Sequence, residues 1–269
     1  MSAITVADTP SLEERLVQHW RAVLPQVKVE HEPYDHLYFE DFFPSDFYAE
    51  MLKSFPAPEK YQAFNRDRYA RADGESARDI IVLQDSGIAH LDEPLRSFWR
   101  AIGEAASSDV LKRHVFNILK RDVALRLGIK EEDAADADAF VSVLLVRDTE
   151  GYKIRPHPDG FPRLVTLMLY LPEDNGREDL GTSIYVEQPF YKRLVGDKFR
   201  EVKRFPFRPN SAAAFAVNDL PQRRSLHGRE PIESVPDARN VIIVTWYSEL
   251  PKGEKSKDRR PQSVHKRLG

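Results

Sequence analysis

The sequence predicts an α+β fold, in which helices come first and buttress a jelly-roll core of short strands. Apolar residues recur at helical spacing in the first half of the chain, whereas short runs of β-branched and aromatic residues follow Asp138. Turn-prone stretches, such as residues 172–176, separate these runs. Short strands with turns between them are typical of a sandwich or barrel, and a preceding block of helices is typical of an α+β arrangement.

Four helices are expected, over residues 11–24, 44–55, 94–106 and 109–127. The first has the spacing of a capping box, because Glu14 follows Ser11 at the required distance. The last is followed by Gly128, and glycine commonly ends a helix because it accepts left-handed backbone geometry. Residues 57–80 are polar and have no clear period, so we expect a loop there.

Strands are expected near residues 37–39 and over residues 139–146, 164–171, 183–186, 212–217 and 241–247. The simplest organisation is a single domain over residues 1–250, with a helical part at 11–128 and the jelly-roll core at 139–249. A tail with seven Lys or Arg against two acidic residues follows at 251–269, and we expect it to be flexible.

Composition excludes several classes of protein. The chain has 269 residues, of which 41% are hydrophobic, enough for a sizeable core. Its net charge of −3 lacks the basic excess of a nucleic-acid binder. It contains no cysteine, so disulfides, thiolate metal sites and cysteine nucleophiles are excluded. No signal peptide is visible at the start and no apolar run approaches the roughly 20 residues of a membrane helix, so we expect a cytoplasmic protein without a membrane partner.

Two short stretches carry the candidate chemistry. The first is His157-Pro158-Asp159, and the second contains His227. Residues two apart on an extended chain point to the same face, and Pro158 favours extended backbone at His157. Two imidazoles and one carboxylate form the ligand set of non-heme Fe(II) oxygenases. His157, Asp159 and His227 are therefore candidate metal ligands, and the simpler alternative is a pair of surface histidines with a loop aspartate.

A second His-x-Asp sequence, His90-Leu91-Asp92, competes with the first. Asp92 precedes Glu93 and Pro94, where it would make a good helix N-cap. Because helix capping would explain this second sequence, we expect His90 and Asp92 to have a structural role and not to bind a metal.

Arg239 stands twelve residues after His227, at the start of the last expected strand. Its planar guanidinium could hold a carboxylate through two parallel hydrogen bonds. We expect His227 and Arg239 on successive antiparallel strands, joined by a loop at residues 231–238. Neighbouring strands lie about 4.8 Å apart, which would bring Arg239 within reach of a ligand on the metal.

These pieces occur in an order that resembles the 2-oxoglutarate-dependent oxygenase superfamily, and within it the prolyl-hydroxylase-like branch. The resemblance runs from Val141 to Glu249 and implies a double-stranded β-helix of the jelly-roll or cupin-like type. It is carried by the stretches His157-Pro-Asp159, Arg163-Leu-Val-Thr-Leu-Met-Leu-Tyr170, Leu180-Gly-Thr-Ser-Ile-Tyr185, Pro209-Asn-Ser-Ala-Ala-Ala-Phe-Ala-Val217, Arg224-Ser-Leu-His227-Gly and Arg239-Asn-Val-Ile-Ile-Val-Thr-Trp-Tyr247.

The resemblance implies that His157, Asp159 and His227 bind Fe(II), and that Arg239 pairs with the distal carboxylate of the co-substrate 2-oxoglutarate. Tyr170 matches a position where some relatives bind the same carboxylate, and its alternative is an ordinary core tyrosine. The spacing from His227 to Arg239 is slightly longer than in many relatives, so Arg224 and Arg229 remain alternatives to Arg239. The implied reaction consumes O2 and hydroxylates an unactivated C–H bond of a small molecule, such as an amino acid or a metabolite intermediate.

Two other functions stay open. One is a protein hydroxylase that acts on proline in an extended peptide, and the other is a non-enzymatic cupin-like protein that binds a metal or a ligand. A deep pocket capped by residues 60–80 would favour a small-molecule substrate, and an open groove would favour a peptide. The arginine-rich stretch 65–74 is either a lid that recognises an anionic substrate or a solvated surface loop.

Overall fold

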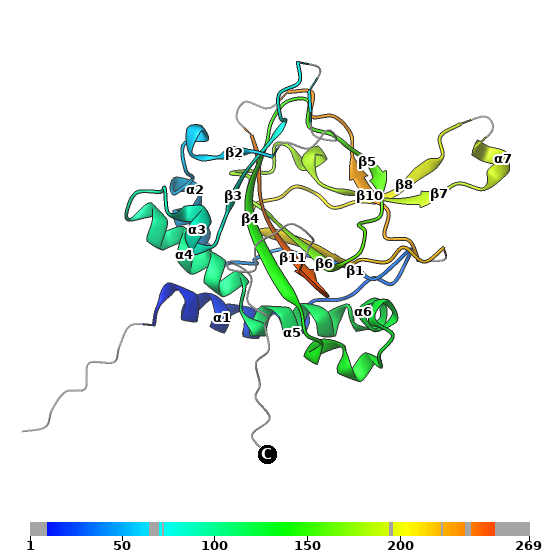
Figure 1. Cartoon of the computed structure of the whole chain (residues 1–269), viewed down its shortest axis with the longest axis horizontal. Coiled ribbons are helices and arrows are strands. Elements are labelled where there is room, and N and C mark those ends of the chain that lie inside the picture. Colours follow the sequence, from blue (N-terminus) through cyan, green and yellow to red (C-terminus); the bar gives the residue numbers. More distant parts are fainter. Residues whose placement is uncertain are drawn as a thin grey trace, which may run out of the picture.

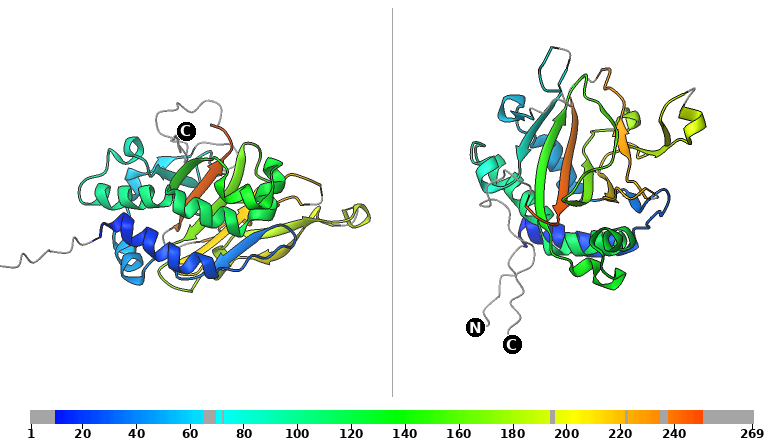
Figure 2. Two further views of the ribbon diagram at one scale, coloured as in Figure 1. Left: turned by 90° about the horizontal axis from the view of Figure 1, so that it is seen from below. Right: turned by 45° about the vertical axis from the view of Figure 1, so that its right-hand side comes forward.

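A computed structural model describes residues 10–64, 70, 71, 73–193, 196–221, 223–234 and 238–250. The described chain is an α+β structure with two antiparallel sheets, and helices from its first half cover one face of the larger sheet (Figures 1 and 2). The tail at 251–269 lies outside the described residues. Within the described part of the chain, no helix is both long and apolar enough to cross a bilayer.

The α-helices are α1 (Leu12–Val23), α2 (Ser45–Lys53), α3 (Asp85–Ile88), α4 (Leu95–Ala106), α5 (Asp109–Ile118), α6 (Lys120–Leu127) and α7 (Phe190–Arg193). Short 3₁₀ turns are η1 (Leu24–Gln26), η2 (Pro58–Lys60), η4 (Glu131–Asp136) and η5 (Glu178–Leu180).

The first three expected helices are confirmed, and the fourth is divided in two. Both hydrogen bonds of the capping box join Ser11 and Glu14, and Gly128 ends α6 with a φ of 68°. Leu119 interrupts the expected long helix, with φ −94° and ψ 18°. Its side chain is fully buried in the core between the helices and the sheet. Apolar periodicity continues through this point, so tertiary packing sets the break.

The larger sheet has the strand order β1 (His36–Phe39), β9 (Ser211–Ala216), β6 (Arg163–Tyr170), β11 (Arg239–Tyr247), β4 (Phe140–Asp148), β3 (Arg78–Val82) and β2 (Gln62–Ala63). The smaller sheet has the order β5 (Ile154–His157), β10 (His227–Arg229), β7 (Ser183–Glu187) and β8 (Phe199–Arg204).

All the expected strands are present, but the expected loop at 57–80 is wrong in part. That segment contains β2 and the beginning of β3. β5 and β8 were not among the expected strands either, whereas a strand that carries His227 was expected and is present as β10. β8 is polar and partly exposed along its length, and β10 has only three residues. Strands of this kind form because they pair with neighbouring strands, and the local sequence does not reveal that pairing.

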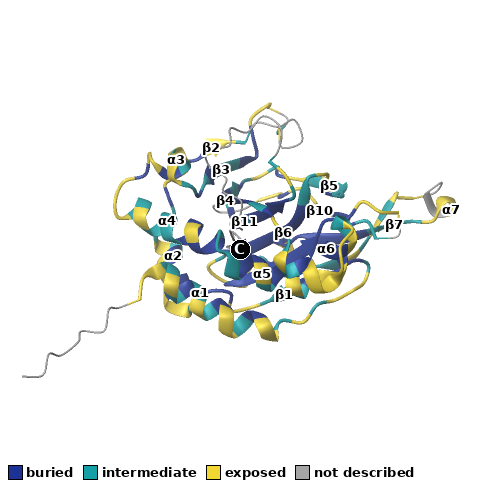
Figure 3. Cartoon of the chain, turned by 60° about the horizontal axis from the view of Figure 1, so that its bottom comes forward, coloured by how far each residue is buried: buried dark blue, intermediate teal, exposed yellow. Residues whose placement is uncertain are grey.

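Strand alternation divides the core into two parts, as β11 illustrates. Ile242, Val244 and Trp246 face the helices, whereas Val241 and Ile243 face the side of the smaller sheet. Successive side chains of a strand point to opposite faces, so a sheet covered on both faces is apolar throughout. The helices, the larger sheet and the smaller sheet thus form three layers. Figure 3 shows the result: the interior strands are buried (dark blue), and the outer faces of the helices are exposed (yellow).

The expectation that His227 and Arg239 lie on neighbouring strands is wrong. β10 belongs to the smaller sheet and β11 to the larger one. The two residues therefore belong to different sheets and are not neighbours in one ladder. The hairpin of β7 and β8 projects away from the body of the molecule (Figure 1).

Candidate metal centre and cavity

Three of the predicted site residues meet at one end of the smaller sheet. His157 ends β5 and His227 begins β10, and the two are direct partners in the register of these strands. Their ring centroids are 4.5 Å apart. Asp159 follows β5 and is buried. One donor atom from each of the three lies within 4.8 Å of the others, so this group could hold a metal ion.

Both imidazoles are held in the same tautomer by the backbone. Nδ1 of His157 lies 2.9 Å from the carbonyl of Arg155, and Nδ1 of His227 lies 3.0 Å from that of Ser225. A carbonyl only accepts, so each Nδ1 carries the hydrogen. Each Nε2 is thereby directed at Asp159, at 3.7 Å from one of its oxygens.

The electrostatics of the group favour neutral imidazole beside a charged carboxylate. Burial lowers the pKa of His227 to about 4, although Asp159 works in the opposite direction. Burial would raise the pKa of Asp159, but His227, His157 and Arg163 outweigh it and hold that pKa well below its usual range. At neutral pH the lone pair of His227 Nε2 therefore faces a carboxylate oxygen, and no proton lies between them.

Two further side chains orient Asp159. The hydroxyl of Thr166 donates to Oδ2 at 3.1 Å, and the guanidinium of Arg163 donates to Oδ1. Fixed tautomers and a hydrogen-bonded carboxylate are the usual surroundings of metal ligands. The Nε2 atoms of both imidazoles and the carboxylate of Asp159 converge, so a cation placed between them could be bound by all three side chains. The donor set, two nitrogens and one carboxylate with open positions beside them, fits a non-heme Fe(II) ion.

The group opens into a cavity between the two sheets. Apolar side chains line its middle, and guanidinium groups line it at several points. The lining residues are Phe64, Arg78, Leu144, Tyr152, Ile154, His157, Asp159, Arg163, Thr166, Met168, Thr182, His227, Gly228, Arg229, Arg239, Ile243, Thr245 and Tyr247.

Arg239 lines this cavity, but its guanidinium already has protein partners. NH1 donates to Asp148 at 2.8 Å, and Nε donates to the carbonyl of Leu180 at 2.6 Å. Asp148 also accepts two hydrogen bonds from Arg78, at 2.6 and 2.9 Å. The register places Arg78 and Arg239 opposite Asp148 on either side, so the three form one row across β3, β4 and β11.

Arg229 lies in the same cavity and has far fewer contacts. Its NH1 lies 3.4 Å from the carbonyl of Gly181, and its Nε is buried without a hydrogen-bond partner. Burial and the neighbouring charge of Arg239 lower the pKa of Arg229 to about 10, so it remains a cation at neutral pH. The other alternative, Arg224, pairs with Asp219 and Glu187 and does not line the cavity.

Tyr170 is fully buried beneath the arginine end of the cavity. Its hydroxyl accepts a hydrogen bond of 3.1 Å from the backbone N–H of Thr182, and its ring centroid lies 5.4 Å from the guanidinium carbon of Arg239. Tyr170 is not among the side chains that line the cavity. These contacts are those of a core tyrosine that packs against Arg239.

The second His-x-Asp sequence stays apart from the site, but its predicted capping role is wrong. His90 is exposed, and its Nε2 lies 2.7 Å from the carbonyl of Lys60. Pro94 occupies the N-cap position of α4, and the Glu93 carboxylate accepts the hydrogen bond from the Ser97 N–H at 3.3 Å. Asp92 is exposed and instead lies 3.5 Å from Lys60.

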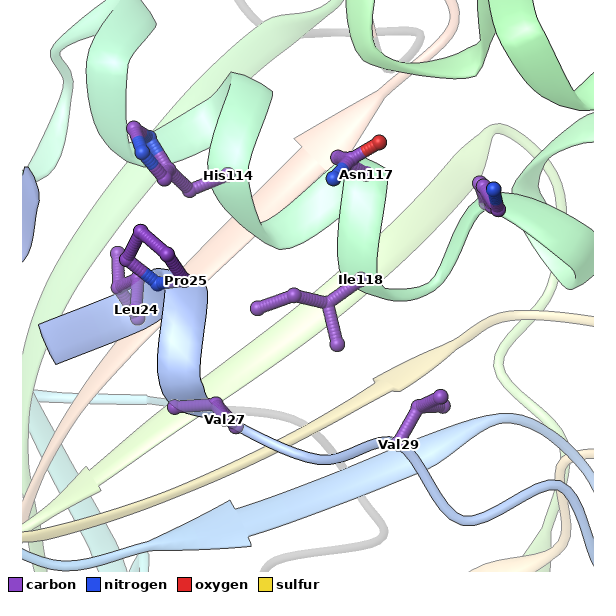
Figure 4. A pocket seen from close by; sticks show the side chains of 8 residues that line it. Leu24, Pro25, Val27, Val29, His114, Asn117 and Ile118 are labelled. Carbon is purple, nitrogen blue, oxygen red and sulfur yellow. The ribbon is translucent and has the colours of Figure 1, made fainter.

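A second hollow lies on the helical side of the molecule, beside η1 and α5 (Figure 4). Leu24, Pro25, Val27, Val29 and Ile118 make much of its lining. His114 also lines it, but its Nδ1 is bonded to the carbonyl of Val110 at 2.8 Å. The hollow brings together no set of metal-ligating side chains among the described residues.

Sequence reasoning missed four polar residues of the site, namely Arg78, Asp148, Arg163 and Thr166. One signal was available. Asp148 is a charged residue at the end of a strand whose other residues are mostly apolar. By strand alternation its side chain points to the same face of the sheet as Leu144 and Val146. In the arginine-rich stretch 65–74, Arg66 and Arg68 lie outside the described residues, and Arg71 lies 3.8 Å from Asp73.

No protein-family model matches the sequence, and no curated protein matches it either. Similar solved structures include a prolyl hydroxylase from Trichoplax adhaerens in complex with a peptide of hypoxia inducible factor. It is 13% identical, with a TM-score of 0.49, over 88% of this chain and 89% of that one. A viral collagen prolyl hydroxylase from Paramecium Bursaria Chlorella virus-1 is 16% identical, with a TM-score of 0.41, over 78% and 94%.

HygX from Streptomyces hygroscopicus, with nickel and 2-oxoglutarate bound, is 12% identical, with a TM-score of 0.44, over 79% of this chain and 82% of that one. All three likenesses are distant, and the site itself has to carry the functional argument. The chain thus resembles, among solved structures, prolyl hydroxylases and a protein that binds a metal ion together with 2-oxoglutarate.

Proposed function

We propose that this chain is an Fe(II)- and 2-oxoglutarate-dependent dioxygenase that hydroxylates an unactivated C–H bond of a small molecule. One observation carries the proposal. The Nε2 atoms of His157 and His227 each lie 3.7 Å from an oxygen of the buried Asp159, with both Nδ1 atoms bonded to backbone carbonyls. Such a group is incomplete without a cation.

In this proposal His157, Asp159 and His227 hold the iron, and the arginine end of the cavity holds the organic acid. Arg239 is the residue that the sequence predicts for the acid. The two sheets form the jelly-roll core of one oxygenase domain over residues 1–250, with the double-stranded β-helix arrangement. Helices α1, α4 and α5 buttress the larger sheet from outside.

Bound iron would supply the oxidising chemistry. One oxygen atom of O2 enters the succinate formed as 2-oxoglutarate loses carbon dioxide, and the other converts the substrate C–H into C–OH. The protein orients the reactants and keeps the site dry. Leu144, Ile154 and Ile243 line the cavity and exclude water. Arg163 and Thr166 keep the Asp159 carboxylate directed at the ion.

A small substrate is favoured over a peptide by the residues that enclose the cavity. Phe64 and Arg78 come from the segment at 60–80, and both contribute to its lining. Phe64 follows β2 and Arg78 begins β3, so this segment contributes part of the cavity wall.

Anaerobic titration of the purified protein with Fe(II) and 2-oxoglutarate tests the proposal. A weak visible charge-transfer band should grow only when both are present, and it should be absent in His157→Ala. Succinate release with candidate small molecules would then identify the substrate. A cupin-like binding protein would form no succinate and would show no specific need for Fe(II).

A further inference from the structure

We infer that Arg229 holds the terminal carboxylate of the organic-acid co-substrate, and that Arg239 is committed to Asp148. The inference rests on the proposed function and refines one of its residue assignments.

Arg239 is poorly placed to exchange partners. Its guanidinium is held by the Asp148 carboxylate at 2.8 Å and by the Leu180 carbonyl at 2.6 Å. Its side chain is only 3% exposed. Its NH2 group has one longer contact, at 3.4 Å from the Thr182 hydroxyl. Asp148 is itself fully buried, so a ligand that took NH1 of Arg239 would weaken a buried ion pair. Breaking such a pair is strongly unfavourable because one charge is left uncompensated.

Arg229 has the opposite character. It is 6% exposed, makes no ion pair among the described residues, and keeps a buried Nε without a partner. A buried cation with unsatisfied donors is costly in the free protein. A carboxylate that enters the cavity would remove this cost, and a guanidinium fork is suited to bind it through two parallel hydrogen bonds.

Arg229 is also at a suitable distance from the metal group. It follows His227 by two residues on β10, and both side chains line the cavity. The register of β10 against β5 shifts between these two residues. Two residues of chain still span at most about 7 Å, comparable to the length of an extended five-carbon diacid. An acid that contacts the metal through one end can therefore reach Arg229 with the other.

The charge balance of this end of the cavity points the same way. Arg78, Arg229 and Arg239 bring three guanidinium groups, and Asp148 is the carboxylate that pairs with two of them. These groups carry three positive charges against one negative charge, and Arg229 is the guanidinium that makes no ion pair among the described residues. An anionic ligand group beside Arg229 would offset part of this excess of positive charge.

The test compares two co-substrates that differ only in the terminal carboxylate. Binding of 2-oxoglutarate and of 2-oxopentanoate to the Ni(II)-loaded protein is measured anaerobically by calorimetry. Wild type should prefer 2-oxoglutarate by about 100-fold, the size expected for a desolvated charge pair. Arg229→Gln should reduce that preference to a few fold. Arg224 is a partly exposed arginine outside the cavity, and Arg224→Gln should leave the preference unchanged.

A stability measurement separates ligand binding from a structural role. Arg229 lacks an ion-pair partner, so Arg229→Met should melt at the same temperature as wild type or higher in the absence of ligand. If Arg229 instead stabilised the folded protein, Arg229→Met would have a lower melting temperature than wild type. If the Gln variant does not fold, Arg229→Met takes its place in the calorimetric comparison.

The outcomes are distinguishable. The inference is overturned if Arg229→Gln or Arg229→Met keeps the full preference for 2-oxoglutarate, or if Arg239→Gln alone abolishes it while the protein stays folded. If wild type binds no 2-oxoglutarate in the presence of metal, the proposed function fails, and this inference fails with it.

Discussion

His157 and His227 are register partners on adjacent antiparallel strands, with their ring centroids 4.5 Å apart. Side-chain direction alternates along a strand, so a shift of one residue in this pairing would turn one imidazole away from the other. The ladder between β5 and β10 thus positions the two imidazoles that we propose as metal ligands. Asp159 lies just beyond the ladder and depends on Arg163 and Thr166 for its orientation.

Replacing His157 by alanine should weaken metal binding by more than about 100-fold, because losing even an outer partner of a ligand costs roughly 10- to 100-fold. The half-buried position of His157 at the end of β5 makes a large loss of stability unexpected. His90→Ala is the matched control, since His90 belongs to the exposed second His-x-Asp sequence. Anaerobic titration with Ni(II) measures both, and equal affinities would contradict the assignment.

Gly228→Ala should damage the metal group without touching a ligand. A Cβ at Gly228 would lie 2.7 Å from the carbonyl oxygen of Ile154 and 3.0 Å from the nitrogen of Pro156, both on β5. β5 would have to move away from β10, and His157 with it. We expect metal affinity to fall by about 10-fold or more, as for other losses of ligand orientation.

Gly160→Ala is the control for that variant. Gly160 adjoins Asp159, yet a Cβ there has no heavy atom within 4 Å. Its metal affinity should equal that of wild type. Metal titration that gives the two alanine variants the same affinity would show that strand spacing does not control the group.

Asp148→Asn should destabilise the protein strongly. Asp148 is fully buried and pairs with both Arg78 and Arg239, so its removal takes away the negative charge that lies against two buried guanidinium groups. The free energy of unfolding, from urea titration, should fall by about 3 kcal/mol or more. Asp46→Asn breaks an exposed pair with Arg15 and should have a much smaller effect. Similar losses in the two variants would refute this role of Asp148.

Much of the fold, and the convergence of His157, Asp159 and His227, could be predicted from sequence because the signals are local. His157 and Asp159 are two residues apart next to a proline, and the apolar runs of β4, β6 and β11 mark central strands. Arg78 and Asp148 were not predicted, since their partnership depends on the register of strands about seventy positions apart in sequence. The error over β10 and β11 has the same origin, because adjacency in sequence does not fix which sheet a strand joins.

His36 should make the stability of the protein depend on pH. Its ring is fully buried, its Nδ1 is bonded to the carbonyl of Tyr34 at 2.9 Å, and its Nε2 lies 3.6 Å from Glu30. Burial lowers the pKa of His36 from its ordinary 6.5, and Lys203 adds to this, while the Tyr34 carbonyl, Glu30 and Asp35 oppose it.

The direction of the effect follows from proton linkage. Below pH 6.5 the unfolded chain protonates His36 while the folded protein keeps it neutral, so the unfolded state binds more protons. The free energy of unfolding should therefore fall as the pH drops from 6.5 towards the folded pKa. In His36→Gln this fall should be shallower, because glutamine does not titrate. Urea unfolding of both proteins at a series of pH values measures it, and parallel curves would show that His36 is not the group responsible.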